Sequence, residues 1–206
     1  MKLAGRLDRI EPFYVMELAK AAARMAASPA CDPAQGGRRM IRLNVGEPDF
    51  GAAPAVRDAL ARIAQGPTPY TDSLGLPALR EAISHWYAQR HGLAIAPERI
   101  AITAGASAGL QLACLALFER GDEVLMPDPC YPCNRHFVSA TDATPRLLPA
   151  GADGRFQLDA DQVRAAWTPA TRGVLLASPS GGDTVRSGSC TYSRRTFRAA
   201  VGQGRF

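Results

Sequence analysis

The chain has 206 residues, 47% of them hydrophobic, and carries a formal net charge of +5. This length allows one globular domain or slightly more, and no apolar run is long enough to span a membrane. Residues 181–206 contain five Arg against one Asp, whereas the first 180 residues hold 19 basic and 18 acidic side chains. The excess charge therefore belongs to the last segment, which argues against a nucleic-acid surface on the rest of the chain.

Apolar spacing along the chain predicts alternating helices and strands. Helices are expected over residues 12–27, 54–65, 76–91, 110–117, 131–140 and 158–167. Strands are expected over residues 41–45, 100–103, 124–126, 146–148 and 173–177. A β-α-β alternation of this kind predicts an α/β fold with a mainly parallel sheet covered by helices.

Residues 104–109 form a run of very small side chains, Ala-Gly-Ala-Ser-Ala-Gly, between an expected strand and an expected helix. Such a loop presents free backbone N–H groups at the positive end of a helix dipole, which suits a phosphate. The run is neither a G-x-G-x-x-G fingerprint nor a P-loop, because it lacks a lysine. Tight packing of helix on strand explains the same residues, so this segment alone leaves both readings open.

Four further segments surround this loop in a fixed order. They read LNVGEPDF (residues 43–50), YTDSLGLPALREAI (70–83), PDPCYP (127–132) and GVLLASPS (173–180). Together with the small-residue loop, they resemble the class I/II aminotransferases, which are pyridoxal-phosphate-dependent enzymes of fold type I. The resemblance covers roughly residues 10–180. It implies transfer of an amino group from an amino acid to a 2-oxo acid, with pyridoxal 5'-phosphate as cofactor.

The resemblance also implies roles for individual residues. Gly105, Ala106 and Ser107 match the loop that binds the cofactor phosphate, where the Ser107 hydroxyl adds to the backbone donors. Tyr131 matches the aromatic residue that stacks on the pyridine ring. Without the family, Tyr131 would be read as an ordinary loop or core aromatic.

Two more positions take roles from the resemblance. Tyr70 matches a tyrosine that reaches the cofactor phosphate of the partner subunit in a homodimer; on its own it would be read as a half-buried tyrosine. Gly46, in the GEPDF run, matches the glycine whose backbone approaches the substrate carboxylate; on its own it would be read as a turn glycine. No metal site and no nucleic-acid partner are implied.

The implied fold is a three-layer α-β-α large domain with a mainly parallel sheet, here incomplete, together with the N-terminal segment of a small domain. We expect residues 1–50 to form an N-terminal arm and small-domain segment. Residues 51–180 are expected to form part of the domain that binds pyridoxal phosphate. Residues 181–206, rich in Arg, Ser and Gly, are expected to form an aberrant tail without regular structure.

The resemblance stops after Ser180, where the family continues with Asn-Pro-x-Gly and this chain has Gly-Gly-Asp-Thr. A shifted reading frame would explain the break, and a divergent but genuine tail is the alternative. The only lysines are Lys2 and Lys20, and neither matches the lysine that forms the Schiff base with the cofactor. The sequence therefore predicts a chain that is truncated before this lysine and inactive by itself.

Other functions remain open at this point. The chain is either part of an aminotransferase, a non-catalytic fragment of a frameshifted gene, or part of another fold type I enzyme such as a C–S lyase. A DNA-binding regulator with an aminotransferase-like domain is disfavoured, because only about 40 residues precede the GEPDF run and a winged helix needs more. The substrate's side chain is not readable from these motifs.

Cysteine usage gives a separate indication. Cys130 and Cys133 form a C-x-x-C, a spacing found in redox pairs and in half zinc sites. No second pair accompanies it, and adding His136 makes only three ligands, so an ordinary place in the loop that holds Tyr131 is favoured. Five cysteines, an odd number, and the absence of a signal-peptide pattern predict a cytoplasmic protein.

Overall fold

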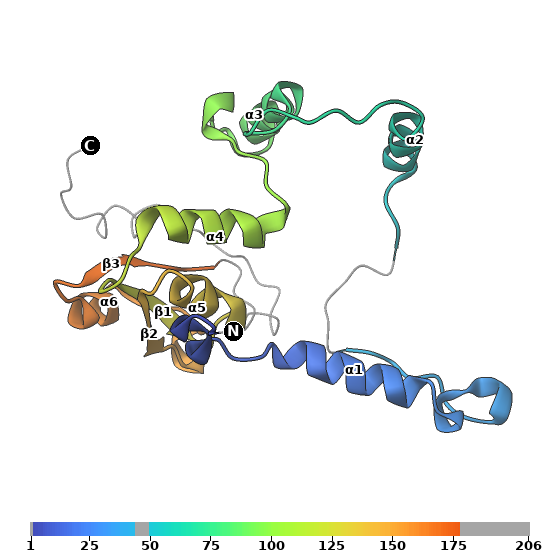
Figure 1. The fold of residues 1–206 in the computed structure, drawn as a ribbon, viewed down its shortest axis with the longest axis horizontal. Helices are drawn as coiled ribbons and strands as arrows, with labels where there is room; N and C mark the ends of the chain where they lie inside the picture. Colours follow the sequence, from blue (N-terminus) through green and yellow to red (C-terminus); the bar gives the residue numbers. More distant parts are fainter. Residues whose placement is uncertain (1, 44–49, 178–206) are drawn as a thin grey trace. The chain divides into compact units, whose positions relative to one another are not determined.

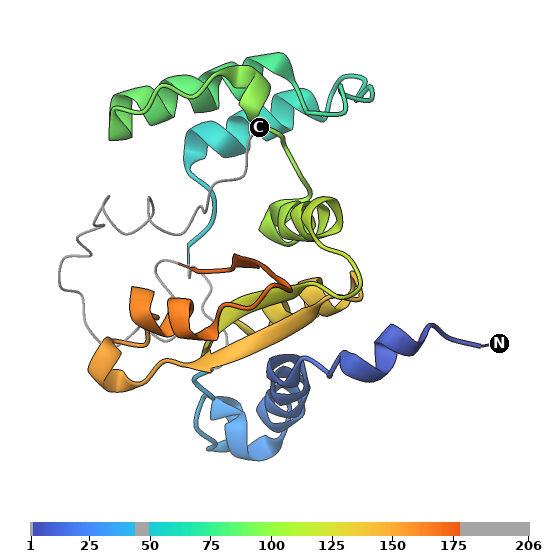
Figure 2. The same cartoon turned by 90° about the vertical axis from the view of Figure 1, so that its left-hand side faces the viewer.

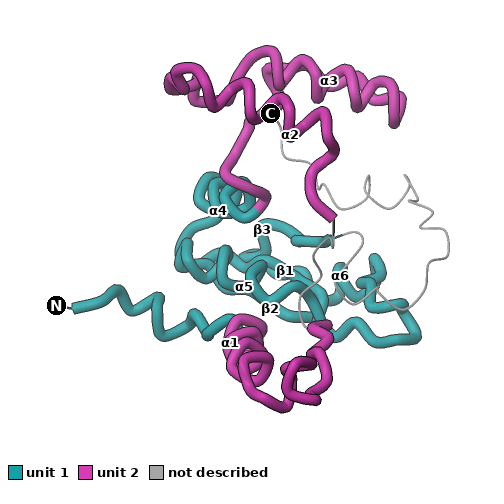
Figure 3. The backbone as a smooth tube through the Cα atoms, turned by 90° about the vertical axis from the view of Figure 1, so that its right-hand side faces the viewer, with its two compact units in different colours: residues 1–13, 107–206 teal, residues 14–106 magenta. Residues whose placement is uncertain are grey.

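The computed structural model describes residues 2–43 and 50–177. The chain divides into two compact units (Figure 3). Unit 1 comprises residues 1–13 and 107–206, and unit 2 comprises residues 14–106. Within the described ranges, no helix is long and apolar enough to cross a membrane.

Unit 1 is built on a parallel sheet of three strands in the order β2-β1-β3 (Figure 1). Its elements, in chain order, are η1 (Gly5–Arg9), α4 (Gly105–Leu117, which begins at the end of unit 2), β1 (Glu123–Asp128), α5 (Pro132–Ser139), β2 (Thr144–Pro149), η5 (Ala152–Gly154), α6 (Ala160–Ala166) and β3 (Thr171–Val174). Strand β1 is the central one, because β2 and β3 pair with it on either side. This arrangement confirms the expected α/β fold with a parallel sheet.

Side chains of β1 alternate between two buried faces of the sheet. Val124 and Met126 point to one face, where they form the core with Cys114 of α4 and Val138 of α5. Helix α4 thus lies along this face, as two views at right angles show (Figures 1 and 2). Val124 and Met126 are fully buried.

The other face of the sheet lies toward the end of α6. Leu125 points to this face and pairs in register with Arg146 of β2. The Arg146 guanidinium donates a 3.0 Å hydrogen bond to the carbonyl of Ala166, at the end of α6. Because Leu125 is fully buried as well, the sheet has helices on both faces and unit 1 is a three-layer α-β-α structure.

The start of α6 is fixed by a capping box. Asp159 accepts hydrogen bonds from the backbone N–H groups of Asp161 and Gln162, and the Gln162 side chain accepts one from the Asp159 N–H. This reciprocal pattern satisfies donors that the first turn of a helix leaves free. The local sequence therefore specifies the residue at which α6 begins.

Unit 2 contains helices that end at clear local signals. They are α1 (Tyr14–Ala26), α2 (Pro54–Ile63) and α3 (Pro77–His91), with short turns η2 (Pro29–Cys31), η3 (Pro33–Gln35) and η4 (Pro97–Arg99). Proline begins α2 and α3, where its missing N–H costs nothing. Gly92 ends α3 in the left-handed conformation, with φ of 64°.

The expected strand at residues 100–103 is not formed. Instead, the Ile102 N–H donates a 3.0 Å hydrogen bond to the carbonyl of Leu74, in the turn before α3. Residues 41–43, the described part of the other early strand, are not in a strand either. A strand requires a hydrogen-bonded neighbour, and each described strand of unit 1 pairs with another strand of that unit.

Candidate cofactor-binding site

The small-residue segment that sequence analysis singled out forms the first turn of α4. Gly105 is the first residue of this helix and has φ of 80°, a left-handed conformation that most residues with a Cβ adopt only with strain. Its N–H donates to the carbonyl of Thr103, and its carbonyl accepts from the Thr103 hydroxyl, both at 2.8 Å. These two hydrogen bonds stabilise the turn that precedes α4 and so fix where the helix begins.

The first turn of α4 is open to solvent. Gly105, Ala106 and Ser107 are all exposed, and the turn contains no acidic residue. Among the residues that the structure describes, none forms a hydrogen bond with the Ser107 hydroxyl. Backbone N–H groups of a first turn have no partner inside their helix, so this turn offers uncovered donors at the positive end of the dipole.

The start of α4 lies level with the carboxyl end of β1. The helix has 13 residues and the strand has six, so each is about 20 Å long. A tight turn joins them, in which the Asp122 N–H donates to the Glu119 carbonyl at 3.1 Å, and the helix packs back along the sheet. The helix therefore runs antiparallel to β1 and begins at the edge where the strand ends. Ligands bind at this carboxyl edge in α/β sheets.

Tyr131 stands at the same edge, three residues after the end of β1 and directly before α5. Its side chain is 44% exposed, so one part of the ring is covered and another is available. A hydrogen bond with Cys133 and, to a lesser extent, burial raise the pKa of the Tyr131 phenol. The ring is therefore neutral at physiological pH, as a stacking surface for a flat heterocycle should be.

The two remaining candidate residues do not belong to unit 1, which forms this edge. Tyr70 lies in the segment between α2 and α3 of unit 2, and its side chain is fully exposed. Gly46 lies outside the described residues, as does the segment from residue 181 to the end of the chain. Their roles therefore stay predictions.

Lys2 and Lys20 are the only lysines among the 206 residues. Lys20 lies on α1 of unit 2, is exposed, and donates a 2.7 Å hydrogen bond to Glu17 on the same helix. This is the pairing of a solvated helix surface, where such ion pairs contribute little. Lys2 precedes η1, the first element of unit 1.

The C-x-x-C pair flanks Tyr131, and both thiols are free. Burial raises the pKa of the Cys130 thiol, although the guanidinium of Arg135 acts in the opposite direction. Cys130, which is partly buried, is therefore protonated at neutral pH. In the described part of the chain, no group of three His, Cys, Asp or Glu side chains is placed to hold a metal ion.

One contact at this edge was not foreseen from sequence. The ring of Phe13 packs edge-on against Tyr131, with centroids 6.0 Å apart and planes at 77°. Phe13 belongs to unit 1, although it lies more than 100 residues earlier in the chain. The only sequence signal is an apolar residue after Pro12 at the start of a helix, which gives no indication of its distant partner.

Comparison with known proteins agrees with this geometry. The family model for aminotransferase class I and II matches residues 38–183. The valine–pyruvate aminotransferase of Mycobacterium tuberculosis is 38% identical over 172 residues, covering 83% of this chain and 42% of that protein. The (5-formylfuran-3-yl)methyl phosphate transaminase of Methanocaldococcus jannaschii is 33% identical, covering 86% of this chain and 44% of that protein.

Solved structures give the same result. The crystal structure of an aminotransferase from Mycobacterium tuberculosis superimposes with a TM-score of 0.78 at 37% identity, covering 88% of this chain and 44% of that one. The aspartate aminotransferase of Rhizobium meliloti gives 0.75 at 33% identity, covering 88% and 44% respectively. The chain thus has the fold of the pyridoxal-phosphate aminotransferases of fold type I.

The chain belongs to the class I and II aminotransferase family. Members of this family use pyridoxal phosphate, act on amino acids and oxo acids, and are generally dimeric. The chain spans less than half the length of the curated relatives described above. The expected family is therefore confirmed, together with its incomplete coverage.

Proposed function

We propose that this chain supplies the phosphate-binding and ring-stacking part of a pyridoxal-phosphate-dependent aminotransferase that acts on an amino acid and a 2-oxo acid. One observation carries the proposal. The exposed first turn of α4 and the half-exposed ring of Tyr131 lie at the same edge of one parallel sheet. A phosphate donor set and an aromatic platform at that edge suit a flat, phosphorylated cofactor.

The described residues fit the phosphate end of this cofactor. A dianion at the start of α4 would accept from the backbone N–H groups of Ala106 and Ser107 and from the Ser107 hydroxyl. Gly105 supports this with its left-handed φ, and no acidic residue in the first turn opposes it. Tyr131 would cover one face of the ring.

When bound, pyridoxal phosphate supplies an electron sink that allows an amino group to be transferred to and from it. The residues of this chain contribute binding and orientation to that chemistry. The helix start fixes the phosphate, and the neutral ring of Tyr131 fixes the plane of the heterocycle. Gly46 is proposed to approach the substrate carboxylate, and Tyr70 to reach the cofactor phosphate of a partner subunit in a homodimer.

Neither lysine of this chain suits the role of the residue that binds the cofactor covalently. Lys20 is paired with Glu17 on a helix surface, and Lys2 precedes the first element of unit 1. A catalytic lysine must be held against the cofactor aldehyde and must move a proton there. We therefore propose that the 206-residue polypeptide binds the cofactor non-covalently and does not turn over. This lysine content is also what favours the second candidate function, a non-catalytic polypeptide of the same family.

The test is a titration of the purified chain with pyridoxal phosphate, followed by fluorescence and equilibrium dialysis. Pyridoxal, which lacks the phosphate, should bind roughly a hundredfold more weakly, because several charge-assisted hydrogen bonds are lost. Ser107→Ala should weaken binding of pyridoxal phosphate by about tenfold. Ser28→Ala, outside the proposed site, serves as the matched control and should leave the affinity unchanged.

Borohydride reduction separates covalent from non-covalent binding. We expect no stoichiometric adduct on either lysine by mass spectrometry. An adduct on Lys20 that disappears in Lys20→Arg would contradict the non-covalent proposal and would justify transaminase assays over a panel of amino acids. Equal binding of pyridoxal and pyridoxal phosphate would contradict the phosphate site itself.

A further inference from the structure

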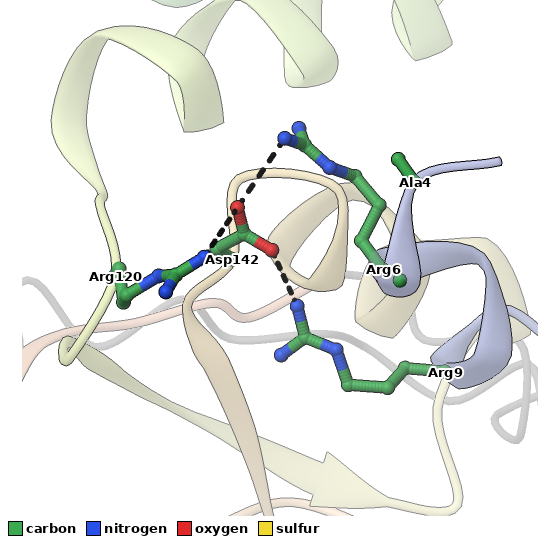
Figure 4. Close-up of a pocket in the computed structure, with 6 residues that line it drawn as sticks. Ala4, Arg6, Arg9, Arg120 and Asp142 are labelled. Carbon is green, nitrogen blue, oxygen red and sulfur yellow. Dashed lines mark hydrogen bonds and ion pairs between the residues drawn. The ribbon is translucent and has the colours of Figure 1, made fainter. Parts of the chain in front are cut away.

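Residues 5–13 form a segment, here named the N-terminal strap, that lies against the turn between α5 and β2. Asp142 of this turn sits among three guanidinium groups (Figure 4). Arg9 donates to it at 2.6 Å, Arg6 lies 3.3 Å away, and Arg120 lies 3.8 Å away. Two of these three arginines belong to the strap.

A second contact ties the strap to the end of α5. Arg6 donates a 2.9 Å hydrogen bond from Nη1 to the carbonyl of Ala140, the residue that follows this helix. The last carbonyls of a helix lack partners inside it, and a cation there is favoured by the dipole. Arg6 thus binds a carboxylate and a helix end at the same time, which specifies where the strap lies.

The strap ends at Phe13, whose ring meets Tyr131 edge-on at 6.0 Å. This distance and the interplanar angle of 77° are those of a favourable aromatic pair. Phe13 is half-buried, and Pro12 before it has a fixed φ, which stiffens the approach. The ion pairs at Asp142 therefore come from the first half of the strap, and the ring contact at Tyr131 comes from its last residue.

We propose that the N-terminal strap positions Tyr131: the arginine contacts at Asp142 and Ala140 hold the strap, and Phe13 sets the plane of the Tyr131 ring. Phe13 is thereby a positioning residue that acts on the cofactor through Tyr131. This inference rests on the proposed function only for its effect on the cofactor, because the ring contact exists without it.

Two arginines of the strap hold Asp142 more firmly than a single ion pair would. A single exposed ion pair holds little, because solvent screens it and side-chain entropy opposes it. Arg6 and Arg9 lie three residues apart on the strap. Once one of them is paired with Asp142, the entropic cost of pairing the other is lower. The Asp142 backbone has φ of 67°, and the Asp142 N–H donates to the Ser139 carbonyl at 3.1 Å. The carboxylate is therefore presented by a defined turn.

The first experiment observes Tyr131 directly. The full chain is labelled with ¹³C on its tyrosine rings, and the resonance of Tyr131 among the five tyrosines is assigned with Tyr131→Phe. Phe13→Leu keeps apolar volume but removes the ring edge, so the Tyr131 ring resonances should move and affinity for pyridoxal phosphate should fall about threefold to tenfold. Phe13→Tyr restores the ring and should restore both readouts.

A second variant changes the strap far from Tyr131 and provides a test that does not depend on the folding of Phe13→Leu. Asp142→Asn keeps the shape of the side chain and tolerates the left-handed φ, but removes the charge that the arginines share. It should move the Tyr131 resonances in the same direction as Phe13→Leu. Asp8→Asn is the matched control, because it makes the same charge change on the strap at an exposed residue that forms no ion pair with any described residue.

The outcomes are distinct. Tyr131 resonances that stay in place in Phe13→Leu and Asp142→Asn, in chains whose circular dichroism is unchanged, would overturn the inference. If Phe13→Leu does not fold, the response of Tyr131 to Asp142→Asn decides alone. If the resonances move but the parent chain does not bind pyridoxal phosphate, positioning by the strap is supported and the proposed function fails.

Discussion

The central strand β1 and the helix α2 have equally clear apolar patterns but very different burial. Val124, Leu125 and Met126 of β1 are fully buried, whereas Leu60 and Ile63 of α2 are 59% and 60% exposed. The difference arises because β1 is paired on both sides and covered on both faces, while the hydrogen bonds of α2 lie within the helix itself. Local sequence is therefore sufficient to form an amphipathic helix, but only neighbours in space can bury its apolar side.

The largest effect is expected from a cavity in the core of unit 1. Leu125→Ala removes a fully buried side chain, so the free energy of unfolding should fall by about 3 kcal/mol. Leu60→Ala, the same substitution at an exposed position of α2, should change it by less than about 0.5 kcal/mol. Urea unfolding followed by circular dichroism measures both. Equal losses would mean that Leu60 is as buried in solution as Leu125.

The next effect tests whether unit 2 contains specific packing of its own. Gly75 has φ of 94°, and a Cβ at this residue would lie 2.6 Å from the Cβ of Ile102 and closer still to its Cγ1. Gly75→Ala should therefore lower the free energy of unfolding by about 2 kcal/mol, from backbone strain and from the clash with a β-branched side chain.

Gly92→Ala is the matched control for this prediction. Gly92 also has a positive φ, of 64°, but a Cβ there would meet open space. Its cost should be limited to the backbone term, about 1 kcal/mol. Measured by urea unfolding, equal costs at the two glycines would show that the contact of the Gly75 turn with Ile102 is not formed in solution.

The same contrast explains what could be predicted from the sequence. The helices α2, α3 and α6 were predicted to within a few residues from apolar spacing, and their boundaries coincide with local signals: proline at the start of α2 and α3, glycine after α3 and the capping box at Asp159. The strand expected at residues 100–103 was wrong, since Ile102 hydrogen-bonds a turn instead of a strand. Strand pairing depends on residues far away in the sequence, which a local pattern does not identify.

The candidate site divides in the same way. The exposed start of α4 and the place of Tyr131 after β1 follow from the order of motifs along the chain. The ring of Phe13 against Tyr131, and the arginines of the strap around Asp142, join residues more than 100 positions apart. Neither Phe13 nor Asp142 lies in a recognisable motif, so only the structure could reveal these contacts.

The smallest predicted effect concerns the turn that joins α4 to the sheet. Asp122 accepts hydrogen bonds from the Glu119 N–H and from Nε of Arg172, each at 2.9 Å. These two contacts, in that order of importance, lower the pKa of the Asp122 carboxyl below its usual value. Arg172 is largely exposed, so solvent screens its part of the interaction.

A lowered pKa in the folded state means that the ionised carboxylate stabilises the fold at every pH above its unfolded-state value of about 3.9. This stabilisation is lost as the pH falls through the folded-state value. As the pH falls from about 5 to about 2, melting temperatures should therefore fall more steeply for the parent chain than for Asp122→Asn, which has no carboxyl to protonate. Asp153→Asn, at an exposed residue of η5, should keep the parent slope. If Asp122→Asn also keeps it, the acid-sensitive contacts lie elsewhere, and the order of β1 does not depend on the charge in the turn that precedes it.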